Sequence, residues 1–263
     1  MDHSIAIPAG SVTGTGTLTA THIAGAPVHR AVLAFVDILG FRTLVLNAFA
    51  SQSEDRAALD AALRASKLLA GKATEERARL SAESPLFQAT TFSDTIVISD
   101  EDTEAGFNRV VESAAQVAAS LMWRGRLCRG GIARGLLVHT GDILLGPALL
   151  NAYDIEQNVA VYPRIVVDDD LSGITPTGKW RLRRESDCLA FIDVFHRISK
   201  FKWNDASVRE GLVKARTAIA AHLLEQKNNS RLDVLTKYRW IAQQFNQFAI
   251  ENPNFKLEQI SIA

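Results

Sequence analysis

The stretch Ala31-Val-Leu-Ala-Phe-Val-Asp-Ile-Leu-Gly-Phe41 decides the fold of this chain. Its six opening residues are apolar, and an uninterrupted apolar run rich in Val and Phe is typical of a buried strand. Asp37 comes next, and a helical pattern begins after Gly40. A carboxylate between a core strand and a helix indicates a functional site, although a helix-capping aspartate explains this stretch alone equally well.

A second aspartate occupies a similar place. Residues 87–99, Phe-Gln-Ala-Thr-Thr-Phe-Ser-Asp-Thr-Ile-Val-Ile-Ser, predict two strands joined by a turn at Ser93 and Asp94. If this hairpin lies beside the first strand, Asp37 and Asp94 can share divalent cations. Carboxylates, together with carbonyl and phosphate oxygens, suit magnesium or manganese. Two aspartates at turns are ordinary if taken alone.

Three motifs, in this order, resemble one enzyme family. Phe-Val-Asp-Ile-Leu-Gly-Phe at 35–41 resembles the F-x-D-I-x-G-F motif of class III nucleotide cyclases. Phe-Ser-Asp at 92–94 is similar to their second metal-binding aspartate at a hairpin tip. Arg-Gly-Gly-Ile-Ala-Arg-Gly at 129–135, which runs into His-Thr-Gly at 139–141, resembles their next core strand and turn.

Two further stretches narrow the resemblance, which covers roughly residues 30–195. Gly-Pro-Ala-Leu-Leu-Asn-Ala-Tyr-Asp-Ile-Glu at 146–156 and Tyr-Pro-Arg-Ile-Val-Val at 162–167 are most similar to the pyrimidine cyclases of Pycsar anti-phage systems. The resemblance implies an α+β fold (an α/β sandwich) with a ferredoxin-like cyclase core and an antiparallel-rich mixed sheet. It also implies an enzyme, a phosphorus–oxygen lyase, in which a pyrimidine nucleoside triphosphate (UTP favoured, CTP next) becomes its 3′,5′-cyclic monophosphate and diphosphate.

The chain divides into three expected parts. Residues 1–30 form an N-terminal arm, 31–195 the catalytic domain, and 196–263 a C-terminal helical extension. The sequence pattern predicts helices over 39–50, 54–80, 101–123, 206–226 and 230–250, and one helix that starts at Gly146-Pro147. It predicts strands over 31–37, 127–138, 162–168 and 188–195, beside the 86–99 hairpin.

The resemblance assigns the site residues. Asp37 and Asp94 would be catalytic and would hold two divalent cations, Mn²⁺ or Mg²⁺, with the backbone carbonyl of Ile38. The remaining nucleotide-binding candidates are apolar residues, helix-start amides, a hydroxyl and three arginines: Phe35, Gly40, Phe41, Thr90, Arg129, Arg134 and Arg164. For each of these arginines, an ordinary structural ion pair is an equally open interpretation.

Two positions depart from the broad family pattern. The family usually places an Asn and an Arg four residues apart on the helix after the glycine-rich strand, where this chain has Leu150 and Asp154. The family reads purines with Lys or Glu four residues before the second aspartate, where this chain has Thr90. A threonine hydroxyl is short but can donate and accept, which favours a pyrimidine. Adenylate or guanylate cyclase, or a degenerate nucleotide-binding scaffold, remains the alternative.

Composition restricts the partners and the compartment. The 29 basic and 29 acidic residues balance, so no electrostatic argument supports binding to nucleic acid. Cys128 and Cys188 both lie in apolar runs and predict buried free thiols in a reducing, cytoplasmic setting. No apolar run is long enough to cross a membrane, and no secretory leader or direct membrane contact is expected.

The implied partners follow from the family. Class III sites are built between two subunits, so the resemblance implies a homodimer that binds a nucleoside triphosphate. The product would be read by a separate effector with a cyclic-nucleotide-binding module.

Overall fold

The computed structural model describes residues 21–23, 26–50, 56–175, 177–200, 205–228 and 232–262, so most of the expected N-terminal arm lies outside the described residues. The strands are β1 (Thr21–Ile23), β2 (Ala26–Ile38), β3 (Gln88–Phe92), β4 (Thr95–Glu101), β5 (Cys128–His139), β6 (Leu144–Leu145), β7 (Ile165–Val167), β8 (Leu182–Arg184) and β9 (Ala190–Ile192). The helices are α1 (Phe41–Ala50), α2 (Arg56–Leu80), α3 (Glu104–Met122), α4 (Pro147–Asp154), α5 (Val194–Ser199), α6 (Asp205–Asn228) and α7 (Leu232–Glu251), with a π-helical turn η1 (Ile155–Val159) and a 3₁₀ turn η2 (Pro253–Phe255).

The fold is α+β, as predicted, with a mixed and mostly antiparallel sheet. The main strand order is β3-β4-β2-β5-β7-β9-β8, with β1 paired to β2 and β6 to β5. β2 is antiparallel to both β4 and β5, and β3 is antiparallel to β4, whereas β5 and β7 are parallel. The order β3-β4-β2-β5, with helices between β2 and β3 and between β4 and β5, is the ferredoxin-like arrangement. The buried run that starts at Ala31 therefore forms the middle of the sheet.

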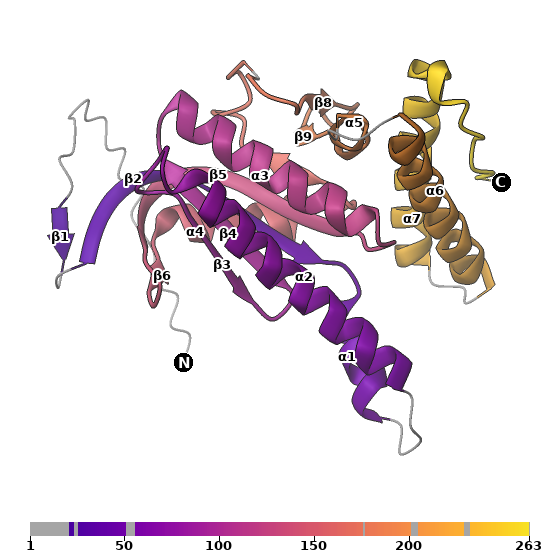
Figure 1. Ribbon diagram of the computed structural model, residues 1–263, viewed down its shortest axis with the longest axis horizontal. Helices are drawn as coiled ribbons and strands as arrows, with labels where there is room; N and C mark the ends of the chain where they lie inside the picture. Colours follow the sequence, from indigo (N-terminus) through magenta and orange to yellow (C-terminus); the bar gives the residue numbers. More distant parts are fainter. Residues whose placement is uncertain are drawn as a thin grey trace, which may run out of the picture.

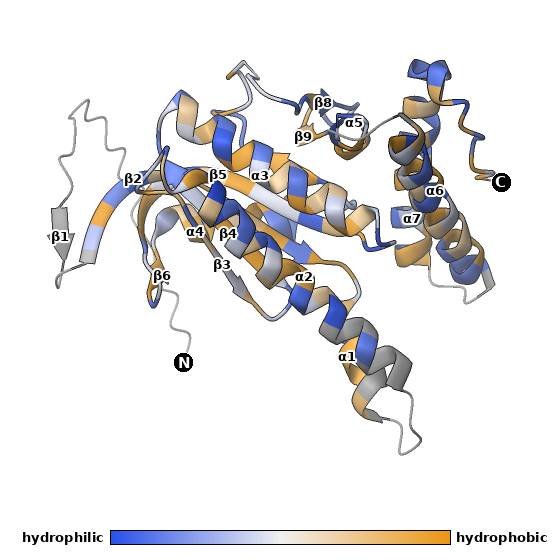
Figure 2. Ribbon diagram, viewed as in Figure 1, coloured by the Kyte–Doolittle hydropathy of each residue, from blue (hydrophilic) through white to orange (hydrophobic). Residues whose placement is uncertain are grey.

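The two faces of the sheet have different covers (Figure 1). α2 and α3 lie on one face, where the even-numbered residues of β2 meet the largest apolar cluster, which includes Val32, Val36 and Leu121. In Figure 2 the strands carry much of the apolar colour, while α2 and α3 show polar residues toward the viewer. α4 lies on the opposite face, where a smaller cluster joins Leu33 on β2 to Ala152 on α4. The second face is therefore covered only in part by protein.

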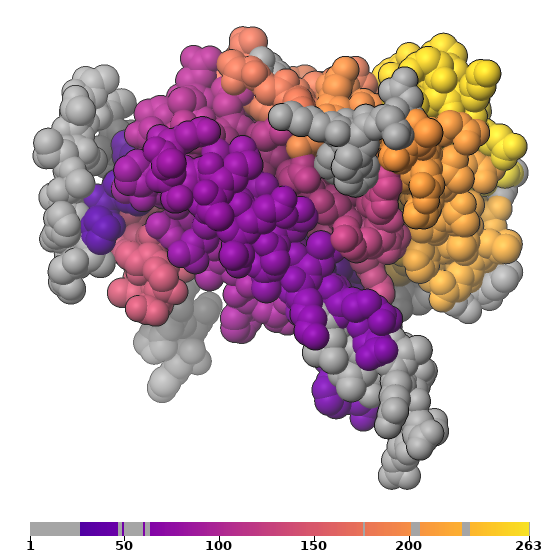
Figure 3. Space-filling model, in the orientation of Figure 1, coloured from indigo at the N-terminus to yellow at the C-terminus, as the bar shows by residue number. Residues whose placement is uncertain are grey.

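The C-terminal helices α6 and α7, predicted over 206–226 and 230–250, pack beside the far end of the sheet (Figure 1). A third apolar cluster joins Phe245 and Phe248 of α7 to Phe195 of α5 and to Met122 of α3. In the space-filling view α1 projects from the body (Figure 3). None of the helices within the described ranges is long and apolar enough to span a membrane.

Several details differ from the sequence prediction. The last strand is only Ala190–Ile192, because Asp193 caps α5 by accepting a hydrogen bond from the backbone N–H of His196. Cys188 is exposed and has φ of 61°, so the prediction that both thiols are buried was wrong for Cys188 and right for Cys128. The stretch around 182–184, for which no strand was predicted, forms the outer strand β8. Its charged residues gave no apolar alternation from which a strand could be predicted.

Candidate functional site

Asp37 and Asp94 meet at one end of the sheet. Asp37 is the next-to-last residue of β2, opposite Thr95 on β4, and Asp94 lies in the turn between β3 and β4. The backbone N–H of Ile38 donates to the carbonyl oxygen of Asp94 at 3.1 Å. The Thr95 hydroxyl donates to the Asp37 carboxylate at 3.2 Å. These two hydrogen bonds hold the hairpin turn against the end of the central strand. The two aspartates therefore lie close together although more than fifty residues separate them in the sequence.

The electrostatic environment of Asp37 is unfavourable for a negative charge. Burial raises the pKa of the Asp37 carboxyl to about 7, and the charges of Asp94 and Glu156 add to this effect. The hydrogen bond from Thr95 and the positive charge of Arg129 oppose it but are outweighed. Two carboxylates in a partly buried site favour protonation of one of them unless a cation is present.

A third carboxylate belongs to the same environment. Glu156 lies in η1, is 0% exposed, and forms an ion pair with Arg129, which stands opposite Asp37 on β5. Burial raises the pKa of Glu156, whereas the Arg129 charge and hydrogen bonds from Gln157 and Arg129 lower it. The sequence placed Glu156 in a motif without giving it a role. Its partnership with Arg129 depends on the π-helical turn, which no periodic pattern predicts.

The donor set fits a hard divalent cation. Asp37 and Asp94 supply carboxylate oxygens. A cation bound between them would reduce the repulsion between their negative charges. Within the described ranges no group of three or more His, Cys, Asp or Glu residues is arranged to hold a metal. Glu156 is already occupied by Arg129. Further ligands would therefore come from backbone carbonyls and from the phosphates of a substrate.

The predicted nucleotide-binding residues Phe35 and Thr90 lie on the same sheet face as Asp37. Strand register places Val97 opposite both Phe35 and Thr90, and alternate residues of a strand share a face. Phe35 is half-buried, and its ring packs edge-on against Tyr153 of α4 with centroids 5.5 Å apart. Phe35, Thr90 and Asp37 therefore share one face of the sheet, and Asp94 lies in the turn at its end.

The glycines of β5 allow α4 to approach this surface. A Cβ atom on Gly131 would overlap the carbonyl oxygen of Ala152, and one on Gly135 would lie 2.9 Å from the backbone nitrogen of Ala148. Glycine in a strand commonly marks such a close approach. Here the backbone of α4 occupies the space.

Gly40 and Phe41 follow directly after the site. Gly40 has φ of 78°, a left-handed conformation that glycine adopts at no steric cost, and its carbonyl accepts the first helical hydrogen bond from Leu44 at 3.1 Å. Phe41 opens α1 and buries its ring in the main core. The start of α1 thus lies close to Asp37 along the chain, with free amides in its first turn.

Arg134 and Arg164 lie away from the aspartates. Arg134 is opposite Val32, on the other sheet face from Asp37, and pairs with Asp170 at 3.0 Å. Arg164 is 4% exposed and pairs with Asp187 at 2.5 Å. Of the three arginine candidates, only Arg129 is brought to the aspartates.

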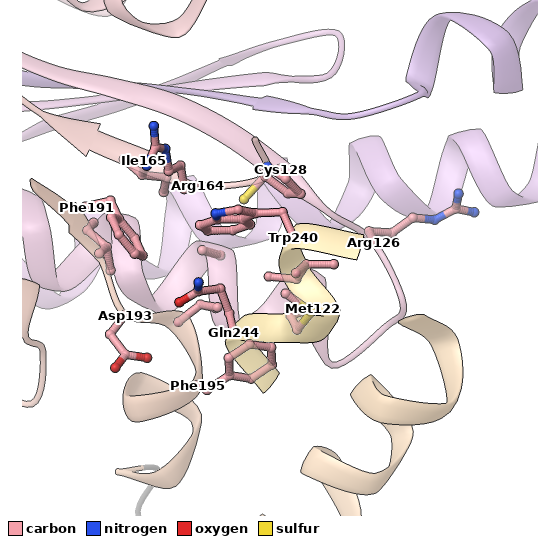
Figure 4. Close-up of a pocket in the computed structure, with 15 residues that line it drawn as sticks. Met122, Arg126, Cys128, Arg164, Ile165, Phe191, Asp193, Phe195, Trp240 and Gln244 are labelled. Carbon is pink, nitrogen blue, oxygen red and sulfur yellow. The ribbon is translucent and has the colours of Figure 1, made fainter. Parts of the chain in front are cut away.

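Arg164 instead joins the sheet to the C-terminal helices. Its guanidinium lies 5.5 Å from the ring centroids of Tyr162 and Phe191 and 5.8 Å from that of Trp240. Figure 4 shows Arg164 beside the indole of Trp240 in a small, mostly apolar cavity. The Trp240 indole N–H donates to Glu185 at 2.7 Å. The motif that suggested Arg164 contains Tyr162 but not the other partners, because Phe191 comes from β9, Trp240 from α7 and Glu185 from the β8–β9 turn.

Leu150 and Asp154, at the positions of the expected Asn and Arg, both point away from the protein. Leu150 is 62% exposed, and Asp154 is exposed on the same helix. Neither contributes to the group around Asp37 within one chain.

Comparisons with known proteins found likeness only among solved structures. No family model and no curated protein matches the chain. The adenylyl cyclase CyaB from P. aeruginosa is 13% identical over 63% of this chain and 92% of that one, with a TM-score of 0.41. The guanylate cyclase domain of RhGC from Catenaria anguillulae in complex with GTP is 13% identical over 62% and 94%, with a TM-score of 0.41.

A third similar structure is a bacterial light-regulated adenylyl cyclase, 12% identical over 72% of this chain and 98% of that one, with a TM-score of 0.41. These values are too low to assign a family. The functional conclusion therefore rests on the motifs and on the geometry around Asp37.

Proposed function

We propose that the protein is a metal-dependent nucleotide cyclase that converts a pyrimidine nucleoside triphosphate, UTP in preference to CTP, to its 3′,5′-cyclic monophosphate and diphosphate. The observation that supports this most strongly is the meeting of Asp37 and Asp94 across the β2–β4 junction, where burial and mutual repulsion raise the pKa of Asp37. Their two motifs resemble the metal-binding motifs of class III cyclases in order and spacing.

The chain's own residues have distinct tasks in this proposal. Asp37, Asp94 and the carbonyl of Ile38 hold two divalent cations, Mn²⁺ or Mg²⁺. When bound, such cations lower the pKa of the attacking 3′ hydroxyl and neutralise the phosphates. Arg129 offers a guanidinium to the phosphates once they compete with Glu156 for it. The amides of Gly40 and Phe41 at the start of α1 suit the outer phosphates.

The preference for a pyrimidine follows from the surface beside the aspartates. Phe35 provides an apolar face for a base, and Thr90 provides a single hydroxyl where purine cyclases of the family place a long charged side chain. Tyr153 packs edge-on against Phe35 and narrows the space. Cyclisation of ATP or GTP is the alternative that keeps the same chemistry.

We infer that a second copy of the chain completes this site in a homodimer. Exposed apolar side chains lie on the β5–β6 hairpin and on α4, the helix that covers part of the face that carries Asp37: Ile143, Leu145, Leu150 and Tyr153. Contiguous exposed apolar residues commonly mark an interface. A second copy packed here would also supply groups that Leu150 and Asp154 do not supply within one chain.

The biological role that we infer is synthesis of a second messenger in anti-phage defence, in the cytoplasm, with a separate cyclic-nucleotide-binding effector as the reader. This inference rests on the resemblance of residues 146–156 and 162–167 to pyrimidine cyclases of that kind. A catalytically degenerate scaffold is the second candidate, because the positions of Leu150 and Asp154 lack the usual polar pair.

A product assay separates these candidates. Purified protein is incubated with Mn²⁺ and ATP, GTP, CTP or UTP, and products are identified by mass spectrometry. Cyclic UMP, with less cyclic CMP, is the expected result. A cyclic purine as main product would contradict the pyrimidine preference, and nucleotide binding without any cyclic product would favour the scaffold.

A further inference from the structure

A buried histidine connects Thr90 to two other strands. His139, the last residue of β5, is 4% exposed. Its Nε2 lies 2.9 Å from the Thr90 hydroxyl on β3, and its Nδ1 lies 2.7 Å from the Ser99 hydroxyl on β4. Ser99 is fully buried, so this side of the network is closed to solvent.

The imidazole is neutral in this environment. Burial lowers the pKa of His139 to about 4, and the nearby charges of Arg77 and His29 act in the same direction. A neutral imidazole has one N–H donor and one nitrogen acceptor, so its two hydroxyl partners must take opposite roles. If the Thr90 hydroxyl donates to Nε2, it can only accept from a ligand; if it accepts from Nε2, its O–H is free to donate to a ligand.

Thr90 stands at a suitable distance from the aspartates for a nucleobase. Thr90 precedes Phe92 by two positions on β3, which is about 7 Å of strand, and Phe92 lies opposite Thr95, the neighbour of Asp37. The separation is comparable to the span of a ribose, so phosphates held at Asp37 and Asp94 would place a base near Thr90.

We propose that His139 is a positioning residue for nucleobase recognition, which fixes the direction of the Thr90 hydroxyl and so determines which pyrimidine edge it accepts. Uracil presents O4 as an acceptor beside N3–H as a donor, and cytosine presents the reverse pair. A hydroxyl with one fixed role distinguishes these edges, whereas a freely rotating hydroxyl satisfies both. This inference rests on the proposed function, because it requires that nucleotides bind at this face.

The test compares base selectivity in binding, because 3′-deoxynucleotides lack the attacking hydroxyl and cannot be cyclised. Dissociation constants for the 3′-deoxy forms of UTP, CTP, ATP and GTP are measured by calorimetry with Mn²⁺. The proteins are wild type, His139→Phe, Thr90→Ala, the double variant and a control, His29→Phe. His29 is also buried, and neither ring nitrogen has a hydrogen-bond partner among the described residues.

We expect His139→Phe to reduce the ratio between the dissociation constants of the two pyrimidine analogues by about fivefold to tenfold. This is the effect expected when one hydrogen bond that distinguishes the two bases is lost. The double variant should match Thr90→Ala, and His29→Phe should match wild type. Unchanged selectivity in His139→Phe, or equal losses in His29→Phe, would overturn the inference.

Two further outcomes keep this result separate from the proposed function. If His139→Phe does not fold, His139→Gln replaces it, and a smaller loss of selectivity in the same direction is expected; no loss would overturn the inference. Selective binding by a wild type that makes no cyclic product would defeat the cyclase proposal and leave the His139 inference standing. No binding of any of the four analogues would overturn both.

Discussion

At Asp37, burial and a neighbouring carboxylate both disfavour the charged form, and this gives a prediction about pH. The pKa of Asp37 is raised from 3.8 to about 7 in the folded protein, so the native state binds more protons between these values. Stability should therefore fall as pH rises from about 4 to about 7 and stay reduced above it. Asp37→Asn removes this penalty, and we expect a gain on the order of 1 kcal/mol at pH 8 without metal, after allowance for solvent screening.

Urea unfolding at pH 4 and pH 8 measures this directly. The gain should be much smaller at pH 4, where Asp37 is protonated in the folded protein and pH is close to its ordinary pKa of 3.8 in the unfolded chain. A variant that is less stable than wild type at pH 8 would show that Asp37 is not strained by its neighbours. Added Mn²⁺ should stabilise wild type more at pH 8 than at pH 6, because binding requires the ionised carboxylate.

The buried pair of Arg129 and Glu156 yields a second prediction. Removing one partner of a buried ion pair leaves an uncompensated charge, which typically costs about 3–5 kcal/mol. We expect Arg129→Met to lower the free energy of unfolding by about 3 kcal/mol, the lower end of this range. The Glu156 side chain left without a partner is 0% exposed, but the arginine that is removed is itself 19% exposed. Glu156→Gln should cost less, and the double variant should cost less than the sum of the two.

Denaturant unfolding of the single and double variants gives the coupling between the two residues. The exposed pair of Lys214 and Glu210, 2.7 Å apart on α6, is the matched control and should change stability by less than about 0.5 kcal/mol per residue. Additive effects of the Arg129 and Glu156 variants would contradict the pairing.

The sequence could predict that Asp37 and Asp94 lie at the ends of strands, because both strands have clear apolar patterns. It could not predict the pairing of Glu156 with Arg129, because the π-helical turn at the end of α4 shifts the direction of Glu156 without a periodic pattern. It also could not separate Arg129 from Arg134 and Arg164. That choice depends on which sheet face each guanidinium occupies and which acids, such as Asp187, lie nearby in space.

At the scale of elements, α4 depends on the glycines of β5. A Cβ on Gly131 would overlap Ala152 and lie 2.7 Å from the Cβ of Ile155, so Gly131→Ala must displace α4 and η1. Overpacking of this kind typically costs about 1–3 kcal/mol. We expect Gly131→Ala to lower stability by roughly 2 kcal/mol and to weaken nucleotide binding, because η1 carries Glu156.

Gly141 provides the control, since a Cβ there would meet nothing within 4 Å. Thermal unfolding of Gly131→Ala beside Gly141→Ala, together with 3′-deoxynucleotide binding, tests the contact. Equal stability of the two variants would mean that α4 does not rest on β5 as described.

Long periodic elements were predictable and short ones were not. The helices α3, α6 and α7 follow apolar faces that the sequence displays over many residues. The strands β6 and β8 contain two and three residues, too few for alternation to be recognised. β6 forms against the long strand β5, and β8 forms against β9 at the edge of the sheet. Helix α5 replaced the end of the last predicted strand because Asp193 caps it.

At the scale of the whole molecule, the C-terminal helices share their core with the sheet. Trp240 stacks on Tyr162 with centroids 5.4 Å apart and donates to Glu185. Its truncation to alanine should cost about 3–5 kcal/mol, as large buried aromatic truncations do. We expect Trp240→Ala to lower the unfolding midpoint strongly while the transition stays single.

Urea unfolding followed by circular dichroism and by near-ultraviolet signals checks this prediction. Leu232→Ala, at a position that is 71% exposed at the start of α7, is the control and should have almost no effect. A loss of helix signal at low urea, before the sheet unfolds, would instead show that α6 and α7 form an independent unit. The apolar cluster that joins Phe191 and Phe195 to Phe245 argues for one cooperative unit.

The most direct test of the account is the rate of cyclic nucleotide formation in three matched aspartate variants. With Mn²⁺ and UTP, Asp37→Asn and Asp94→Asn should each lose at least about a hundredfold in turnover, on the order of 3 kcal/mol in transition-state stabilisation. Asp142→Asn, at an exposed turn position, should retain wild-type turnover. Wild-type turnover in either Asp37→Asn or Asp94→Asn would contradict the claim that the two carboxylates at the β2–β4 junction form the catalytic site.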